Sequence, residues 1–378
     1  MKKDYMNKLI RNSVREFSQK YLRPAASMID ETKEYPDELF KEMAKRNYMG
    51  VTLPKEYGGV GLGFEQFVIV IEEIARACGS STMHITSPNT LVGHTIKNFG
   101  TEEQKRKYLV PIAKGEKVGT FAMSEPNAGS DASALETVAR KVDGGYVING
   151  RKTFITSGPT ADFVVVFAIT SEDINKRAVT AFFVEKGAEG LTAGKPERKM
   201  GMNGSKTSDI ILEDVFVTED AILGEKDNGF AMAMRGLDCG RIGVAGQAVG
   251  IAQAALDEAV KFTKGRRQFN RRIADFQGVQ FMLADMQTRV QAARLLVKEA
   301  AIKFDKDQSA TQEASMAKYY ATETAFKVAS DALQLHGAYG YVKDYPIERI
   351  FRESRVTTIY EGTSQIQQIV IARELLKD

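Results

Sequence analysis

The residues best placed to do chemistry lie near the C-terminus, in the segment from Ile359 to Gln367 with the sequence IYEGTSQIQ. A single carboxylate, Glu361, stands there between an aromatic residue and Gly362. Glycine leaves the backbone open to close approach by a flat substrate or cofactor, and a carboxylate in such a place could act as a general base. Taken alone, a solvated surface charge is the stronger interpretation, because the chain carries 49 acidic residues and most such residues lie in solvent.

Composition narrows the class of protein. The chain has 378 residues, 43% of them hydrophobic and 27% charged, which is typical of a globular protein with two or three domains. The net charge is only +3, so we expect no nucleic-acid partner. No apolar run could span a bilayer and no signal peptide precedes the first helix, which predicts a cytoplasmic protein without a membrane partner. Cys78 and Cys239 are too few for a zinc site or disulfide framework, so we expect both in the core and no metal.

The first third of the chain has helical periodicity. Apolar residues from Met6 to Tyr21 recur at spacings of three and four, and Pro24 is predicted to end that helix. The glycine-rich segment from Gly58 to Gly63 does not fit the dinucleotide-binding fingerprint and follows a helix, so we expect a bend there rather than a phosphate site. The predicted N-terminal helical domain is 1–117.

Short β-branched runs separated by turn pairs predict a β domain at 118–224. Asp143-Gly144-Gly145 and Asn149-Gly150 are predicted as hairpin turns, and strands joined by tight turns favour an antiparallel barrel or sandwich. A near match of 145–153 to a phosphate-binding P-loop fails because Arg151 breaks the spacing and strands lie on both sides. The expected strands are Thr137 to Val142, Tyr146 to Ile148, Lys152 to Ile155, Phe163 to Ala168, Ala181 to Glu185 and Ile210 to Val217.

The last part of the chain, 225–378, is predicted to be a helical bundle. Apolar residues from Val279 to Val297 keep helical spacing, and the stretch from Glu313 to His336 is almost free of helix breakers. The predicted fold is therefore α+β and multidomain, with an N-terminal α-helical domain, a central antiparallel β-barrel or sandwich and a C-terminal helical bundle.

Three separated motifs resemble those of the acyl-CoA dehydrogenase family, and the resemblance extends along essentially the whole chain. The segment 122–131, AMSEPNAGSD, looks like the flavin-loop signature of that family. The segment 334–341, QLHGAYGY, is similar to its second signature, with Ala338 where the family usually has Gly or Ser. The third motif is the YEGTS of 360–364. The nearest resemblance is to short-chain or butyryl-CoA dehydrogenases, and it implies a C-terminal bundle of four helices.

This resemblance implies a role in fatty acid metabolism as a flavoprotein with noncovalent FAD. The implied reaction is α,β-dehydrogenation of an acyl-CoA thioester: Glu361 removes the α-proton, FAD takes the β-hydride, and the electrons pass to electron-transferring flavoprotein. It also implies a homotetramer. The implied FAD contacts are Met123, Ser124, Ser130, Phe154, Thr156, Arg266, Gln268, Gln277, Gln334, Gly337, Ala338, Thr363 and Gln365.

Some implied roles have alternatives. Arg266 and its neighbours Gln268 and Gln277 match positions that reach the FAD of another subunit, and a guanidinium suits a pyrophosphate. Arg266 could instead be a solvated member of a basic run. Phe154 stands where many family members carry Trp. The implied substrate contacts are Ser130, Asp238, Arg241 and Gly362, and the alternative for Asp238 and Arg241 is a charge pair one helical turn apart.

Glu361 gains support from a second position. The family takes its base either from the C-terminal motif or from a position two residues after the Asp matched by Asp238. Here that position is Gly240, which has no side chain, so Glu361 is the implied base. Burial against flavin and acyl chain would raise its pKa. The resemblance further implies that the backbone N–H of Glu361 polarises the thioester carbonyl.

The substrate and the direction of the reaction stay open. The segment 237–253 resembles short-chain members, which favours a short acyl chain, and the absence of Lys and Arg from 80–96 disfavours glutaryl-CoA. An aryl-propionyl chain is an alternative. The same site could act as an enoyl-CoA reductase, including on aryl-propenoyl-CoA, or as an oxygen-using acyl-CoA oxidase or flavin hydroxylase. A nonenzymatic CoA-binding scaffold is disfavoured by Glu361 and the flavin loop.

Overall fold

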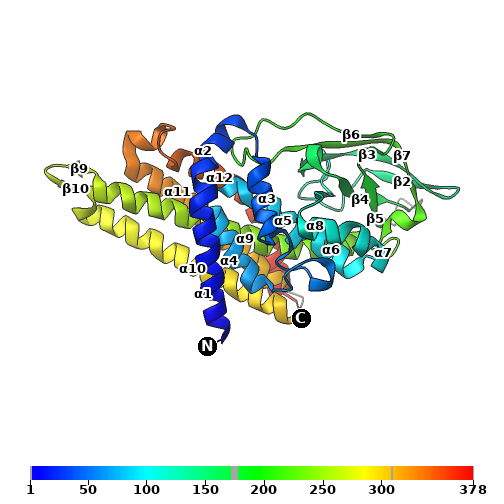
Figure 1. The fold of residues 1–378 in the computed structure, drawn as a ribbon, viewed down its shortest axis with the longest axis horizontal. Coiled ribbons are helices and arrows are strands. Elements are labelled where there is room, and N and C mark those ends of the chain that lie inside the picture. Colours follow the sequence, from blue (N-terminus) through cyan, green and yellow to red (C-terminus); the bar gives the residue numbers. More distant parts are fainter. Residues whose placement is uncertain (1, 172–177, 308–309, 378) are drawn as a thin grey trace.

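The computed structural model describes residues 2–171, 178–307 and 310–377. A β-sheet forms one end of the molecule, and long helices extend from it to the opposite end (Figure 1). Of the N-terminal helices, α1 to α4 cover the middle, and α6 to α8 lie beside the sheet (Figure 1). The N-terminal helices are α1 (Lys2–Phe17), α2 (Arg23–Thr32), α3 (Asp37–Lys45), α4 (Phe64–Ala77), α5 (Thr82–Asn89), α6 (Leu91–Phe99), α7 (Glu102–Gln104) and α8 (Val110–Lys114).

Pro24 does not end the first helix, so that prediction is wrong. The helical path continues from α1 through a π-helical turn, Ser18–Leu22, into α2, where Pro24 lies in the first turn. Proline is tolerated at the start of a helix because the N–H it lacks would have no intrahelical acceptor there. The proline therefore marks the beginning of α2.

The central sheet has the strand order β6-β7-β3-β2-β4-β5-β8, with β1 beside β4. Its pairings are antiparallel except those of β1 and β2 with β4, which confirms the predicted antiparallel-rich fold. Successive residues of β4 face two cores: Phe163 and Val165 pack against helices, whereas Val164 and Val166 pack among strand residues. The strands are β1 (Gly119–Ala122), β2 (Val138–Val142), β3 (Gly145–Thr156), β4 (Phe163–Ile169), β5 (Val179–Glu185), β6 (Leu191–Ala193), β7 (Thr207–Thr218) and β8 (Ile222–Leu223).

Asn149-Gly150 is not a hairpin turn, and the two short strands expected around it form the single strand β3. Its pairing with β7 shifts register between Ile148 and Gly150, which marks a bulge. A Cβ on Gly150 would stand 2.4 Å from the hydroxyl oxygen of Thr137. The glycine therefore permits a close approach within the sheet, as glycines inside strands often do.

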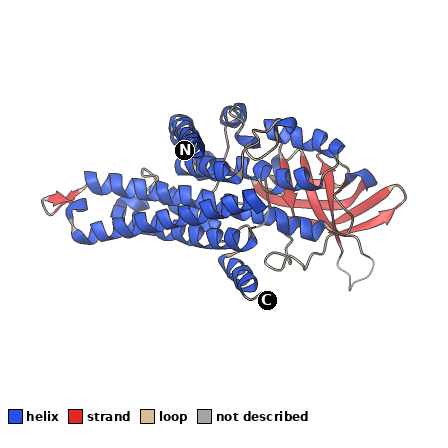
Figure 2. Ribbon diagram, turned by 90° about the horizontal axis from the view of Figure 1, so that it is seen from below, coloured by secondary structure: helices blue, strands red, loops and turns tan. Residues whose placement is uncertain are grey.

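The C-terminal part is the predicted helical bundle. Helix α9 packs against α4, α10 and α11, and a Cβ on its Gly250 would come 2.3 Å from the carbonyl oxygen of Glu72, so small residues allow close helix contact. The hairpin β9–β10 lies at the end opposite the sheet (Figure 2). No helix of the described residues is long and apolar enough to cross a membrane. The elements are α9 (Gly229–Gly265), β9 (Arg267–Gln268), β10 (Arg271–Arg272), α10 (Gln277–Asp307), α11 (Thr311–His336), α12 (Ile347–Thr357) and α13 (Ser364–Leu375).

Candidate active site

Glu361 lies in a tight connection between α12 and α13. Glu361 and Gly362 both have left-handed backbones, with φ of 56° and 90°. The hydroxyl of Thr363 accepts a hydrogen bond from the N–H of Ile366 at 3.3 Å and so caps α13. A non-glycine residue in the left-handed region costs about 1–2 kcal/mol. Such strain persists only where the surroundings hold it. The backbone conformation of this turn sets the direction of the Glu361 side chain.

The Glu361 carboxylate meets helix α9 at Gly240. A Cβ built on Gly240 would stand 2.5 Å from Oε2 of Glu361. Although the residue as a whole is partly exposed, Oε2 is buried and has no hydrogen-bond partner among the described residues. The two positions from which the base was expected are thus neighbours in space. Gly240 supplies the room that the Glu361 carboxylate occupies.

The electrostatic setting of Glu361 suits a base at neutral pH. Burial raises its pKa to about 7, and the nearby cations Arg241 and Lys318 only partly oppose this rise. Burial by the protein alone thus shifts the pKa of Glu361 in the direction that was expected from flavin and acyl chain. A carboxylate with a pKa near the working pH is both available in its ionised form and able to hold a proton.

Asp238 and Arg241 form a buried pair beside this carboxylate. Arg241 Nη1 donates to Asp238 Oδ1 at 2.7 Å, and the hydroxyl of Thr311 donates to Oδ2 at 2.7 Å. Their side chains are 13% and 8% exposed, for Asp238 and Arg241 respectively. The charge pair expected as one alternative therefore exists, but it is not solvated. Arg241 Nε is buried without a partner among the described residues and remains able to donate.

The flavin-loop motif lies at the edge of the sheet and is held by a buried lysine. Lys152 Nζ donates to the carbonyls of Met123 at 3.2 Å and Phe167 at 2.5 Å, and to Glu125 Oε1 at 2.6 Å. The three N–H groups of the ammonium thus have three acceptors. The N–H of Thr153 also donates to the Ser124 carbonyl at 2.8 Å. These contacts fix the loop backbone against strand β3.

Phe154 is presented outward next to this loop. Its side chain is 68% exposed although it is a large apolar ring, and its φ of 55° is unusual for a bulky residue. Ser124 and Ser130 are exposed, Thr156 is partly exposed and Met123 is buried. An exposed aromatic ring beside hydroxyl groups suits a flat heteroaromatic ligand.

A second group of implied FAD residues lies at the opposite end of the molecule, around the β9–β10 hairpin (Figure 2). The guanidinium of Arg266 stands 5.2 Å from the ring centre of Tyr339, so the two segments meet there. Within a single chain this group is far from the group of implied FAD residues at the sheet edge. Two further implied FAD residues, Thr363 and Gln365, lie beside Glu361. The exposed members of the distant group are Gln268, Gln277, Gln334, Gly337 and Ala338.

Three buried side chains around Glu361 escaped the sequence analysis. Lys318 Nζ donates to the Gly362 carbonyl at 2.7 Å, and Gln367 Nε2 donates to the carbonyls of Glu361 and Gly362 at 3.1 and 3.0 Å. The amide of Gln247 accepts from the hydroxyl of Tyr360. One signal was available for Lys318: it interrupts a stripe of alanines at core spacing on its helix.

Three family models match consecutive parts of the chain: the acyl-CoA dehydrogenase N-terminal domain at residues 6–116, the middle domain at 120–215 and the C-terminal domain at 227–376. The chain belongs to the acyl-CoA dehydrogenase family. The 3-(aryl)acrylate reductase of Clostridium sporogenes is 52% identical over 98% of each chain. The CarC subunit of the caffeyl-CoA reductase–Etf complex of Acetobacterium woodii is 48% identical over 98% of each.

A solved structure agrees with this assignment. The butyryl-CoA dehydrogenase of Megasphaera elsdenii superimposes with a TM-score of 0.95, at 39% identity, over 98% of each chain. Membership makes this acyl-CoA dehydrogenase an FAD-dependent oxidoreductase. The residues present fit that cofactor, because an exposed ring at Phe154 and free hydroxyls line the sheet edge, and cationic and amide side chains that suit a pyrophosphate lie at the hairpin.

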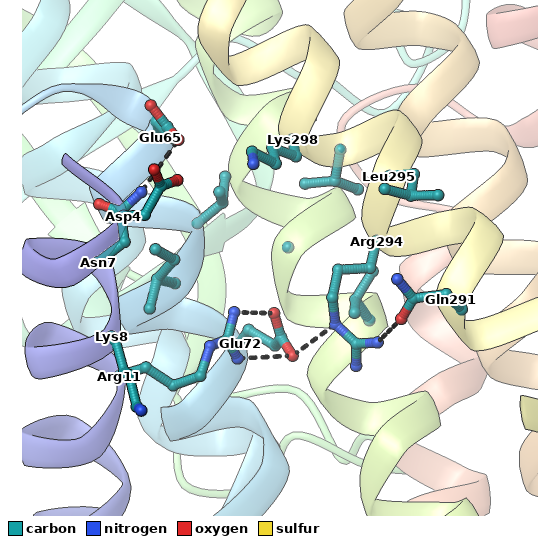
Figure 3. A pocket seen from close by; sticks show the side chains of 15 residues that line it. Asp4, Asn7, Lys8, Arg11, Glu65, Glu72, Gln291, Arg294, Leu295 and Lys298 are labelled. Carbon is teal, nitrogen blue, oxygen red and sulfur yellow. Dashed lines mark hydrogen bonds and ion pairs between the residues drawn. The ribbon is translucent and has the colours of Figure 1, made fainter. Parts of the chain in front are cut away.

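A cavity of about 420 Å³ between α1, α4, α9 and α10 is a different feature (Figure 3). Glu72 crosses it, accepting from Arg11 at 3.2 Å and from Arg294 Nε at 3.0 Å. None of the residues expected to bind FAD or acyl-CoA lines this cavity. The cavity is therefore separate from the group of residues around Glu361.

Proposed function

We propose that the chain dehydrogenates a short-chain acyl-CoA thioester between its α- and β-carbons, with Glu361 as the base. The observation that carries this proposal is the buried, unpartnered Oε2 of Glu361, which lies against the side-chain-free Gly240. FAD, when bound, supplies the acceptor for the β-hydride. Similarity to the M. elsdenii butyryl-CoA dehydrogenase supports the short chain.

The residues of the chain divide the remaining work. Glu361 accepts the α-proton, and its backbone N–H is expected to donate to the thioester carbonyl as negative charge develops there. Asp238 and Arg241 match positions near the pantetheine and adenine ends of CoA, and Arg241 Nε is left to donate. Met123, Ser124 and Phe154 are proposed to border the flavin ring.

A panel of acyl-CoA thioesters assayed with an artificial electron acceptor tests the substrate. We expect the highest kcat/KM on chains of about four carbons, because the segment 237–253 resembles short-chain members and 80–96 offers no cation for a second carboxylate. Glutaryl-CoA and a long straight chain serve as controls. Best turnover on either control would refute the proposed substrate.

The second candidate is the reverse reaction, saturation of an aryl-propenoyl-CoA. The two reductases named above, at 52% and 48% identity, favour it, and one of them is a subunit of an Etf complex. The same base position would then return a proton to the α-carbon. Activity with reduced electron-transferring flavoprotein and an aryl-propenoyl-CoA, exceeding dehydrogenation of butyryl-CoA, would establish this direction.

We further propose a cytoplasmic homotetramer that exchanges electrons with electron-transferring flavoprotein. The separation of the hairpin residues from the sheet edge supports an FAD site shared by two subunits. Light scattering after size exclusion should give four chains per particle. A flavin-loaded monomer would contradict the proposal.

The hairpin contact to FAD is tested by two substitutions. Arg266→Ala should weaken FAD binding by about tenfold or more, because it removes a charge-assisted contact to the pyrophosphate. Arg267→Ala, at the exposed neighbouring residue, removes no such contact and should change FAD binding by less than about threefold.

A further inference from the structure

Lys318 is a fully buried lysine in the middle of α11. Its relative exposure is 0%, and it lies on a stripe of buried alanines, Ala314, Ala317, Ala321 and Ala325, spaced as one face of a helix. Lysine is almost never fully buried unless a partner compensates its charge. The core position therefore needs a reason beyond packing, since an alanine or methionine would fill it without a charge.

The ammonium group of Lys318 holds the turn that carries Glu361. It donates to the Gly362 carbonyl at 2.7 Å, and Gln367 Nε2 donates to the same oxygen at 3.0 Å. Gln367, also 0% exposed, reaches the Glu361 carbonyl at 3.1 Å. Donors from two helices, α11 and α13, thus clamp the two left-handed residues. A strained turn persists only when its surroundings fix it in this way.

The charge of Lys318 has no direct carboxylate partner. Among the described residues, no carboxylate oxygen lies within 4.0 Å of its Nζ. Asp238 is paired with Arg241, which leaves Glu361 and Glu323 as the carboxylates that favour the charged form of Lys318, and the effect of Glu361 is the larger. The titratable and charged groups of this region are Lys97, Asp238, Cys239, Arg241, Lys318, Glu323, Glu353, Tyr360, Glu361 and Glu374.

We propose that Lys318 is a positioning residue for Glu361: it fixes the turn through the Gly362 carbonyl, and its positive charge keeps the Glu361 carboxylate ionised near neutral pH. This inference rests on the proposed function, because it takes Glu361 as the base. Burial lowers the pKa of Lys318 to about 8, with Glu361 opposing that change, so the ammonium is still largely charged at pH 7. Lys318 also lowers the pKa of Glu361.

The test is the pH dependence of flavin reduction when the FAD-loaded protein is mixed anaerobically with saturating butyryl-CoA. Lys318→Met removes charge and donor, Lys318→Gln removes the charge but keeps a donor, and Lys318→Arg keeps both. Loss of a nearby cation raises a carboxylate pKa, so we expect the midpoint of the Met and Gln profiles to rise on the order of one pH unit. The rate at pH 7 should then fall about fivefold and recover by pH 9.

The controls separate a positioning role from a structural one. Lys327→Met, on the exposed side of the same helix, should keep the wild-type profile. Lys318→Arg should keep the wild-type midpoint even where its rate falls. An unchanged midpoint in Lys318→Met overturns the inference, and Lys318→Gln decides it in the same way if the Met variant does not fold. If Glu361→Gln retains full activity, the proposed function itself fails, which is a different result.

Discussion

Replacement of Glu361 by Gln is expected to lower turnover by roughly a hundredfold to ten-thousandfold while FAD content and acyl-CoA binding survive. Glutamine has the shape of glutamate, and Oε2 has no hydrogen-bond partner among the described residues, so the change breaks no recorded contact of that atom. The turn that carries residue 361 is held through backbone carbonyls by Lys318 and Gln367 and should persist. The change removes the proton acceptor and the negative charge that acts on Lys318, while the hydrogen bonds that hold the turn remain.

Anaerobic mixing with substrate measures this directly. In the wild type the flavin should be reduced rapidly, with a rate that rises as pH increases through about 7, because only the ionised carboxylate accepts a proton and burial places its pKa there. In Glu361→Gln the flavin should stay oxidised and the rate should lose this dependence on pH. Glu219→Gln, a change at a side chain that is 65% exposed in the sheet domain, is the matched control and should behave as wild type. Rapid flavin reduction in Glu361→Gln would place the base elsewhere.

Periodicity was sufficient for the helices and most strands, because burial of one face imposes a spacing that a sequence displays. It failed where the backbone departs from regular geometry. The role of Pro24 was predicted wrongly because the same local sequence can place a proline after the end of one helix or in the first turn of the next. Asn149-Gly150 was misplaced because turn propensity is local, whereas the pairing of β3 with β7 over its full length decides the conformation.

The candidate site likewise has residues that the sequence predicts and contacts that it does not. Glu361 could be predicted because a motif carries it, and Gly240 because it stands at a fixed offset from Asp238. Their contact, with a Cβ on Gly240 reaching within 2.5 Å of Oε2, depends on the packing of a C-terminal connection against α9, over a hundred residues earlier, and no spacing rule expresses it. Lys318 and Gln367 were missed because they act through backbone carbonyls, which have no sequence signature. Adjacent residues of the same charge can therefore differ in importance according to the contacts that each forms across the fold.

Lys152 and Arg151 are adjacent residues that illustrate this difference and give the second large expected effect. Lys152 is 0% exposed and donates to Glu125 and to two carbonyls, one of them in the flavin loop. Arg151 points to the other face of β3, is 60% exposed and pairs with Asp209. A buried ion pair that loses one member leaves an uncompensated charge, which costs about 3–5 kcal/mol. A surface pair contributes about 0–1 kcal/mol.

Lys152→Met is therefore expected to destabilise the protein by about 3–5 kcal/mol and to weaken FAD binding, because Glu125 remains buried without its cation and Met123 loses a contact that fixes the flavin loop. Urea unfolding followed by circular dichroism, together with flavin content after dialysis, measures both effects.

Arg151→Met is the control and should shift the unfolding midpoint little. The double variant Glu125→Gln, Lys152→Met removes both charges and should recover part of the lost stability, since a neutral amide is cheaper to bury than an unpaired carboxylate. If Lys152→Met unfolds at the same urea concentration as Arg151→Met, the ion pair does not hold the loop, and the backbone bond from Thr153 to Ser124 must be the contact that does.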